Sequence, residues 1–251
     1  MSSLDSLRDK LATAHRWAAE FGFSEGIDTH LSVRASAETM LVTPFGVHWS
    51  AMQPDYLIEA RFDGSVISGA YELERSAACI HGAIYLRHSD TGAVLHSHML
   101  HATAIACIEG GTVEMIHQNS ARFADRIHYD RAYSGVAFPQ EEGERIAEAV
   151  SQAPIVFLQN HGVIVTGSGI EVAFDDLYYL DRACRLQAIA AGLGSPAIVL
   201  QDETLAKTAE QIESVRERNA FAHFRALQDV SALREVGRAP TSDRILAHGD
   251  D

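Results

Sequence analysis

The sequence predicts an α/β fold in which helical layers cover a β-sheet. Short runs of β-branched and aliphatic residues, each bounded by Gly, Pro or Asp, recur along the chain and indicate strands. Longer segments with apolar residues at helical spacing lie between these runs and towards both ends of the chain. The 251 residues suffice for one large domain, and no linker rich in Pro, Gly or Ser divides them. We therefore expect a single domain over residues 1–236.

The N-terminal third is predicted to contain one helix followed by short strands. Residues 4–21 carry apolar side chains at helical spacing, and Gly22 is a typical stop signal for that helix. Asp63-Gly64 is a strong hairpin-turn signal between the last two strand-like runs. The predicted strands are 31–34, 40–43, 56–59 and 65–67.

The rest of the chain alternates predicted helices and buried strands. Helices at 76–87 and 100–108 stand on either side of a strand that carries His96 and His98. Pro139 and the acidic residues after it open another helix, which leads to a strand at 155–158. The longest predicted helix covers 171–191 and is followed by a helix at 203–228 and a mobile tail at 237–251.

Charge and cysteine usage limit the classes of partner and compartment. The formal net charge of −14 would repel nucleic acid and anionic membrane surfaces, so neither is an expected partner. The three cysteines are odd in number and widely spaced, as in proteins that keep their thiols reduced. Charged residues occupy the N-terminal segment where a signal peptide would be apolar. We predict a soluble cytoplasmic protein.

Three histidines form the most informative pattern in the chain. His96 and His98 stand two apart on a predicted strand, so their side chains project from the same face. His161, in Asn160-His161-Gly162, would supply a third imidazole from just beyond the strand at 155–158. Three such ligands leave open positions on a metal ion for water or substrate. The alternative, unrelated core or surface histidines, would bury imidazoles without partners at a cost in free energy.

Several blocks of sequence resemble the class II aldolase/adducin family and follow one another in the family's order. The resemblance covers roughly residues 5–195. It implies a central mixed β-sheet between helical layers, and homotetramers whose sites lie near subunit interfaces. It also implies a divalent metal on His96, His98 and His161, most typically Zn²⁺, with Mn²⁺ or Fe²⁺ as alternatives. The matching blocks are 30–34, 43–46, 81–85, 91–106, 158–165 and 173–174.

One departure from the family pattern affects the expected chemistry. The sugar-phosphate aldolases of the family have Ser-Ser-Glu where this chain has Arg75-Ser76-Ala77, and that glutamate is their general acid/base. Ala77 has no titratable group. Glu74 lies three residues earlier and would replace the carboxylate only if the local backbone is rearranged. The adducin-like branch of the family also lacks the glutamate, so this chain resembles that branch.

We therefore expect a divalent-metal-dependent lyase, an aldolase or a decarboxylase, acting through a metal-stabilised enolate. Loss of carbon dioxide generates an enolate without prior removal of a proton, so the change at Ala77 favours small, nonphosphorylated keto or hydroxy acids as substrates. A non-haem iron oxygenase on the same scaffold and a noncatalytic, adducin-like assembly module are the alternatives.

Two residues are candidate proton carriers. Tyr133 lies near the position of a tyrosine that some family aldolases send across the subunit interface as an acid, although an ordinary buried tyrosine is an equal alternative. His101 follows His98 by three residues and would either face the site from the next helix or orient a ligand imidazole.

Four residues are candidate substrate contacts. His30 would bind a substrate carboxylate if protonated, or would hydrogen-bond the loop backbone. Arg34 is a second candidate for that carboxylate. Ser76 is the serine that remains of the family's phosphate-binding pair, and Gln118 matches a glutamine of adducin-like members.

Overall fold

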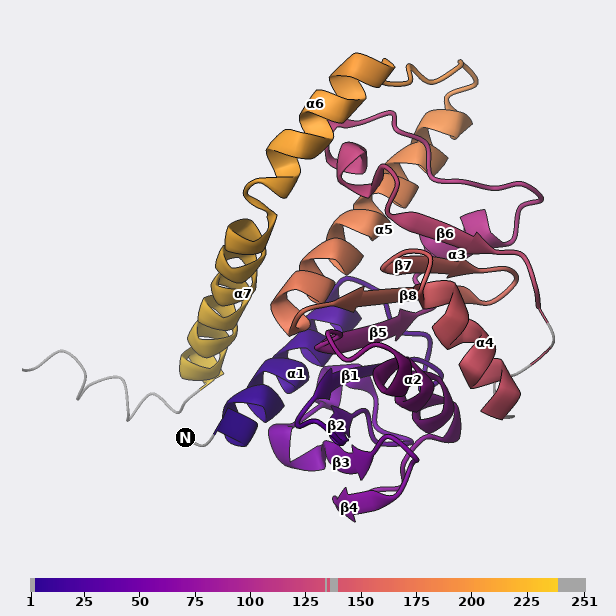
Figure 1. Ribbon diagram of the computed structural model, residues 1–251. Coiled ribbons are helices and arrows are strands. Elements are labelled where there is room, and N and C mark those ends of the chain that lie inside the picture. Colours follow the sequence, from indigo (N-terminus) through magenta and orange to yellow (C-terminus); the bar gives the residue numbers. More distant parts are fainter. Residues whose placement is uncertain (1–2, 134, 136–139, 239–251) are drawn as a thin grey trace, which may run out of the picture.

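One mixed sheet of eight strands runs through the part of the chain that the structure describes, residues 3–133, 135 and 140–238 of a computed structural model (Figure 1). The strand order is β4-β3-β2-β1-β5-β8-β7-β6, and neighbouring strands are antiparallel except for the parallel pair β6 and β7. The predicted mixed sheet is confirmed. Its strands are β1 (His30–Arg34), β2 (Thr39–Val42), β3 (Ile58–Arg61), β4 (Val66–Ser68), β5 (Ala93–Ser97), β6 (Ile127–Asp130), β7 (Ile155–Leu158) and β8 (Gly162–Gly167).

Helices cover both faces of this sheet, as the sequence predicts. In Figure 1, α1, α5 and α7 lie on one side of the strands, while α2 and α4 lie together on the other. Short 3-10 helices η1 (Trp49–Ala51), η2 (Pro54–Tyr56) and η3 (Gln118–Phe123) occur in the connections. The α-helices are α1 (Ser3–Glu20), α2 (Arg75–Arg87), α3 (Leu100–Ala106), α4 (Gln140–Val150), α5 (Ile170–Gly192), α6 (Asp202–Glu213) and α7 (Arg216–Arg238). No helix among the described residues is long and apolar enough to cross a membrane.

Alternation along β1 places different side chains in the two layers. Leu31 and Val33 face the larger apolar core, which contains side chains of α1, α3, α5 and α7. His30 and Ser32 project from the opposite face, where α2 and α4 build a second core. One strand therefore contributes apolar packing on one side and polar groups on the other.

Two buried aspartates of α5 hold the C-terminal helix α7 against the domain. Asp175 accepts hydrogen bonds from Arg122 and His223, each at 2.8 Å. Asp176 is fully buried and pairs with Arg126 at 2.7 Å and Arg216 at 2.5 Å. Burial opposes ionisation of Asp176, but the two guanidinium groups outweigh it and lower the pKa of this carboxyl.

The structure differs from the sequence prediction in four elements. The strand predicted at 56–59 begins two residues later, because Pro54–Tyr56 forms η2. Strand β6 was not predicted, and the apolar run 162–167, which follows His161, forms the separate strand β8. The single helix predicted at 203–228 is divided into α6 and α7. The predicted tail boundary at 237 falls in the last turn of α7, and residues 239–251 lie outside the described residues.

Candidate metal centre

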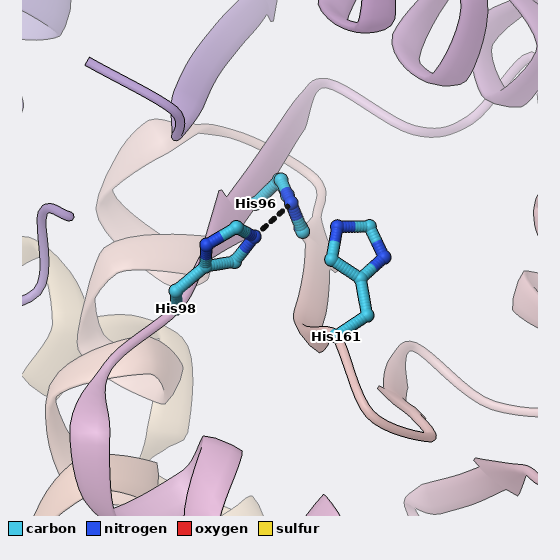
Figure 2. Close-up of side chains that lie close together, drawn as sticks. All are labelled: His96, His98 and His161. Atoms are coloured by element: carbon cyan, nitrogen blue, oxygen red, sulfur yellow. Dashed lines mark hydrogen bonds between the residues drawn. The ribbon is translucent and has the colours of Figure 1, made fainter. Parts of the chain in front are cut away.

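Three imidazoles meet at the ends of β5 and β7. His96 projects from β5, His98 follows its last residue, and His161 lies in the turn between β7 and β8. One ligand atom from each of these side chains lies within 4.8 Å of the other two. Figure 2 shows the three rings facing a common space. The sequence-based expectation that these residues come together agrees with this geometry.

The outer hydrogen bonds of His96 and His98 define which nitrogen each ring offers. His96 Nδ1 lies 3.1 Å from the carbonyl oxygen of Val163, which can only accept, so Nδ1 carries the proton and donates it. His98 Nδ1 lies 2.6 Å from Glu25 Oε2 and donates to that carboxylate in the same way. Both Nε2 atoms are therefore available as ligands, and the two partners fix the orientation of the rings.

The donor set fits a metal ion. The Nε2 atoms of His96 and His98 are 3.0 Å apart, and two bare ring nitrogens at this distance repel one another (Figure 2). A cation between them, either a proton or a metal, makes the separation favourable. Tetrahedral zinc with Zn–N distances of about 2.0–2.1 Å requires ligand nitrogens about 3.3 Å apart. His161, with a ring nitrogen within 4.8 Å of the other two ligand atoms, would supply the third nitrogen.

Burial keeps the imidazoles of His96 and His161 neutral, as metal binding requires. Burial, with the neighbouring rings of His161 and His30, lowers the pKa of His96 well below its ordinary value. Burial and the adjacent His98 lower the pKa of His161 to about 4. Protons therefore compete weakly for these two nitrogens at neutral pH.

The Asn160-His161-Gly162 turn has the conformation that brings His161 to this point. Asn160 adopts a left-handed backbone conformation with φ of 55°, which asparagine tolerates better than most residues. A Cβ atom on residue 162 would lie 2.7 Å from His98 Cδ2 and 2.7 Å from the Ser97 carbonyl oxygen. Glycine at 162 therefore permits the close approach of β8 to His98.

The three histidines open into a cavity of about 450 Å³. Its lining includes three carboxylates and no Lys or Arg among the described residues. The lining residues are Glu25, Asp28, Glu74, Ser76, His96, His98, Tyr133, Gly135, Asn160 and His161.

Besides the three metal ligands, the predicted site residues Ser76 and Tyr133 line this cavity. Ser76 is in the first turn of α2, while Tyr133 is half exposed. Tyr133 lines the cavity that its own chain forms, whereas the family resemblance led us to expect it from a neighbouring subunit.

His30 lies directly behind the metal ligands instead of in the cavity lining. Its ring centroid is 4.8 Å from that of His96, and its exposed fraction is 1%. Burial and the adjacent His81 lower the pKa of His30 well below its ordinary value, so it is neutral. Binding a substrate carboxylate through a protonated His30 does not fit this environment.

Three other predicted residues lie away from the cavity lining. Arg34 donates to the backbone carbonyls of Tyr85, His88 and Thr91, and its guanidinium packs on the rings of Phe62 and Tyr85. His101 faces Asp181 of α5, with His101 Nδ1 3.4 Å from Asp181 Oδ1. Gln118 is exposed at the start of η3. The backbone carbonyls that bind Arg34 give it a structural role in holding β1 to the end of α2 and the loop after it.

Sequence reasoning did not identify Glu25 or Asp28 as cavity residues, and it considered Glu74 as a site carboxylate only with a rearranged local backbone. Glu25 lies in the loop before β1, and its contact with His98 joins segments 73 residues apart. Local sequence carried no signal for that contact. Glu74 is the N-cap residue of α2, which begins at Arg75, one residue before the predicted start at 76.

Comparison with protein families gives one match over most of the chain. The family model described as Class II Aldolase and Adducin N-terminal domain matches residues 9–188. A protein of Pseudomonas aeruginosa named as a candidate aldolase class 2 protein is 28% identical over 210 residues, which are 83% of this chain and 80% of that protein. Human beta-adducin is 28% identical over 208 residues, which cover 78% of this chain and 28% of beta-adducin.

Solved structures have the same fold. An aldolase II superfamily protein from Pseudomonas syringae superposes with a TM-score of 0.83 at 29% identity, covering 95% of each chain. An L-fuculose 1-phosphate aldolase from Glaciozyma antarctica superposes with a TM-score of 0.82 at 24% identity, covering 92% of this chain and 94% of that one. The second likeness concerns the fold alone.

Proposed function

This chain belongs to the class II aldolase and adducin family, and on that premise we propose that it is a divalent-metal-dependent lyase. The reaction is cleavage of a carbon–carbon bond, by retro-aldol reaction or decarboxylation, in a small keto or hydroxy acid without a phosphate group. The observation that carries the proposal is the pair of facing Nε2 atoms of His96 and His98, with His161 beside them, at the wall of an open cavity.

His96, His98 and His161 would hold the ion, for which we propose Zn²⁺. A divalent ion on three neutral imidazoles keeps its full charge and supplies Lewis-acid stabilisation to the oxygen of a developing enolate. Val163 and Glu25 orient the ligand rings through the hydrogen bonds to Nδ1. Because these contacts exist before a substrate arrives, the protein meets the cost of ordering the ligands during folding.

The charge of the cavity supports a substrate without phosphate. The lining carries Glu25, Asp28 and Glu74 and no basic side chain among the described residues. The bound metal ion would compensate the negative charge of a substrate carboxylate next to it. A phosphate group at the other end of the substrate would instead lie near the negatively charged side chains of the lining. The L-fuculose 1-phosphate aldolase acts on a phosphorylated sugar according to its name, whereas the charge of this cavity favours a substrate without phosphate.

We also propose that the chain forms a homo-oligomer, most simply a tetramer. Large apolar side chains remain exposed near the site, among them Leu100 in the first turn of α3 at 74% and Ile108 just after that helix at 59%. Association would remove such surfaces from water. Sedimentation velocity would measure the assembly, and an active monomer would contradict a requirement for it.

Elemental analysis of protein purified without added metal, followed by turnover assays, tests the proposed function. We expect close to one zinc per chain, and release of carbon dioxide or an aldehyde from at least one member of a panel of keto and hydroxy acids. The His96→Ala variant is the matched control without the site. Iron with substrate-dependent oxygen consumption would favour an oxygenase. Protein that binds no metal and turns over no substrate after metal addition would favour a noncatalytic module, a role consistent with the similarity to adducins.

A further inference from the structure

A continuous chain of hydrogen bonds starts at the cavity and runs behind the metal ligands. Glu74 Oε2 accepts from Ser76 Oγ at 2.5 Å and from the backbone N–H of Ala77 at 2.6 Å. Ser76 Oγ lies 3.2 Å from His30 Nε2, and His30 Nδ1 lies 2.7 Å from His81 Nε2. This chain of hydrogen bonds therefore connects the carboxylate of Glu74 at the cavity with the two buried imidazoles of His30 and His81.

The chain of hydrogen bonds continues into the core between α2 and the sheet. His81 Nδ1 lies 2.5 Å from Ser32 Oγ, which in turn lies 2.9 Å from the hydroxyl of Tyr85. Ser32, His81 and Tyr85 are each at most 1% exposed. His81 and Tyr85 are four residues apart on α2 and face the sheet together, so packing holds the inner half of the chain in one arrangement.

The hydrogen bonds of this chain run in one direction when Glu74 is a carboxylate. Oε2 then accepts from Ser76, so the oxygen of Ser76 must accept from His30 Nε2–H. His30 Nδ1 is consequently bare and accepts from His81 Nε2–H. His81 Nδ1 accepts from Ser32, which accepts from Tyr85. Every donor is thus oriented towards Glu74.

This arrangement gives the two oxygens of Glu74 different tasks. Oε2 is occupied by the hydroxyl of Ser76 and the N–H of Ala77, which also makes Glu74 the N-cap of α2. Oε1 has no hydrogen-bond partner in the described part of the chain, although Glu74 lines the cavity. The Glu74 side chain is 15% exposed, and the two hydrogen bonds to Oε2 fix its position. Oε1 is therefore a positioned hydrogen-bond acceptor at the cavity wall.

We infer that Glu74 is the proton-transfer residue of this site, acting through Oε1, and that Ser76 and His30 are positioning residues for it. The inference rests on the proposed lyase function. Oε1 takes a proton from the carbon next to the substrate carbonyl. The C–H electron pair becomes the C=C bond of an enolate, and the carbonyl π pair moves onto its oxygen. Return of the proton from Glu74 to carbon restores the starting compound, so the step needs no further reactant.

The other carboxylates of the cavity are less suited to this task. Glu25 Oε2 is engaged by His98, so a proton on that group would alter the support of a metal ligand. Asp28 is exposed to solvent, and among the described residues no backbone N–H or hydroxyl holds it as Ala77 and Ser76 hold Glu74. A proton-transfer group gains rate from a fixed geometry, which among these three carboxylates Glu74 has independently of the metal ligands.

Proton exchange provides the first test. Zinc-loaded protein is incubated in D₂O with hydroxypyruvate, a small keto acid with C–H bonds next to its carbonyl, and deuterium at carbon 3 is followed by NMR. Glu74→Gln keeps an acceptor for Ala77 but removes the exchangeable carboxylate. We expect it to exchange about 10²–10⁴-fold more slowly than the wild type, with unchanged zinc content and hydroxypyruvate dissociation constant. The control Glu72→Gln removes the same charge from an exposed residue outside the cavity lining and should exchange at the wild-type rate.

The tautomers of His30 and His81 provide a second test, in metal-free protein. Nitrogen-15 NMR of the imidazoles should find the proton on Nε2 in both rings, and Ser76→Ala should shift the His30 signals. Protons on Nδ1 in both rings would contradict the direction of the hydrogen bonds towards Glu74. Wild-type exchange in the Glu74→Gln variant would overturn the role of Glu74 and leave the proposed lyase standing. A zinc-loaded wild type that turns over a keto acid but exchanges no proton next to its carbonyl would overturn the role of Glu74 alone. One that neither exchanges nor turns over any acid of the panel would overturn both.

Discussion

His30 and His96 are paired directly opposite one another on the antiparallel strands β1 and β5. Directly opposite residues project from the same face of a sheet, and the two ring centroids are 4.8 Å apart. The wall behind the metal ligand is thus a second imidazole, which is neutral because it is buried.

Removing one imidazole of the metal centre should remove the metal without unfolding the domain. His98→Ala leaves two of the three imidazole ligands, while the core of a domain of this size does not depend on one ion. Elemental analysis should find little zinc, and far-ultraviolet circular dichroism should match the wild type. His101→Ala is the matched control, because His101 pairs with Asp181 and does not line the cavity. Loss of the folded state in His98→Ala would indicate a structural metal site instead.

Glu25→Gln should weaken metal binding although Glu25 is not a ligand. Its carboxylate accepts from His98 Nδ1 at 2.6 Å and so orients the ring and increases the basicity of Nε2. Loss of such a partner typically lowers metal affinity by about 10–100-fold. Competition with a zinc-binding dye measures this affinity. Equal affinity in the variant and the wild type would show that the contact is incidental.

Gly162→Ala should destabilise the protein and disturb His98. The new methyl group would lie 2.7 Å from both His98 Cδ2 and the Ser97 carbonyl oxygen, and the backbone oxygen cannot move away alone. We expect a loss of about 1–3 kcal/mol in the free energy of unfolding, measured in urea, with weaker zinc binding. Gly192→Ala is the control, since a Cβ atom there has no neighbour within 4 Å. Equal stability of the two variants would contradict the close approach.

Asp176→Asn should destabilise the protein in a pH-dependent way. Asp176 is buried between Arg126 and Arg216, and removing one partner from a buried ion pair typically costs about 3–5 kcal/mol. The guanidinium groups lower its pKa from 3.8, so its contribution is complete above pH 3.8 and disappears as pH falls through the lower, folded-state pKa. The difference in free energy of unfolding between the wild type and Asp176→Asn should therefore shrink below pH 3.8. A difference that is constant down to pH 2.5 would contradict this assignment, and Asp90→Asn, at an exposed site, serves as the control.

A phosphate group should weaken binding to the cavity. Zinc-loaded protein should bind glycolate at least as tightly as 2-phosphoglycolate in calorimetric titrations, because no basic side chain lines the cavity among the described residues. Retro-aldol assays with pentulose and deoxyhexulose phosphates should give kcat/KM below about 10⁴ M⁻¹s⁻¹. Efficient cleavage of a sugar phosphate would overturn the substrate class.

The metal ligands could be predicted because their signal is local. His96 and His98 follow the two-residue period of a strand, and His161 stands in a short motif beside another predicted strand. Most predicted helices and the layered sheet depend on equally local periodicity. Arg34 shows the opposite case, since the three carbonyls that bind it come from residues 51–57 positions away. The link between Glu25 and His98 is a tertiary contact of the same kind, so no pattern in the neighbouring sequence announces it.

The alternation along β1 has a consequence for how this chain tolerates insertions. Odd and even positions of β1 serve opposite layers, with Leu31 and Val33 in one core and His30 and Ser32 on the side of α2. Adding one residue within the strand would exchange the two sets downstream of the insertion, placing a hydroxyl among apolar side chains and a leucine or valine beside an imidazole. Adding two residues would preserve the parity. Length changes in this strand are therefore expected to be tolerated, if at all, only in even steps.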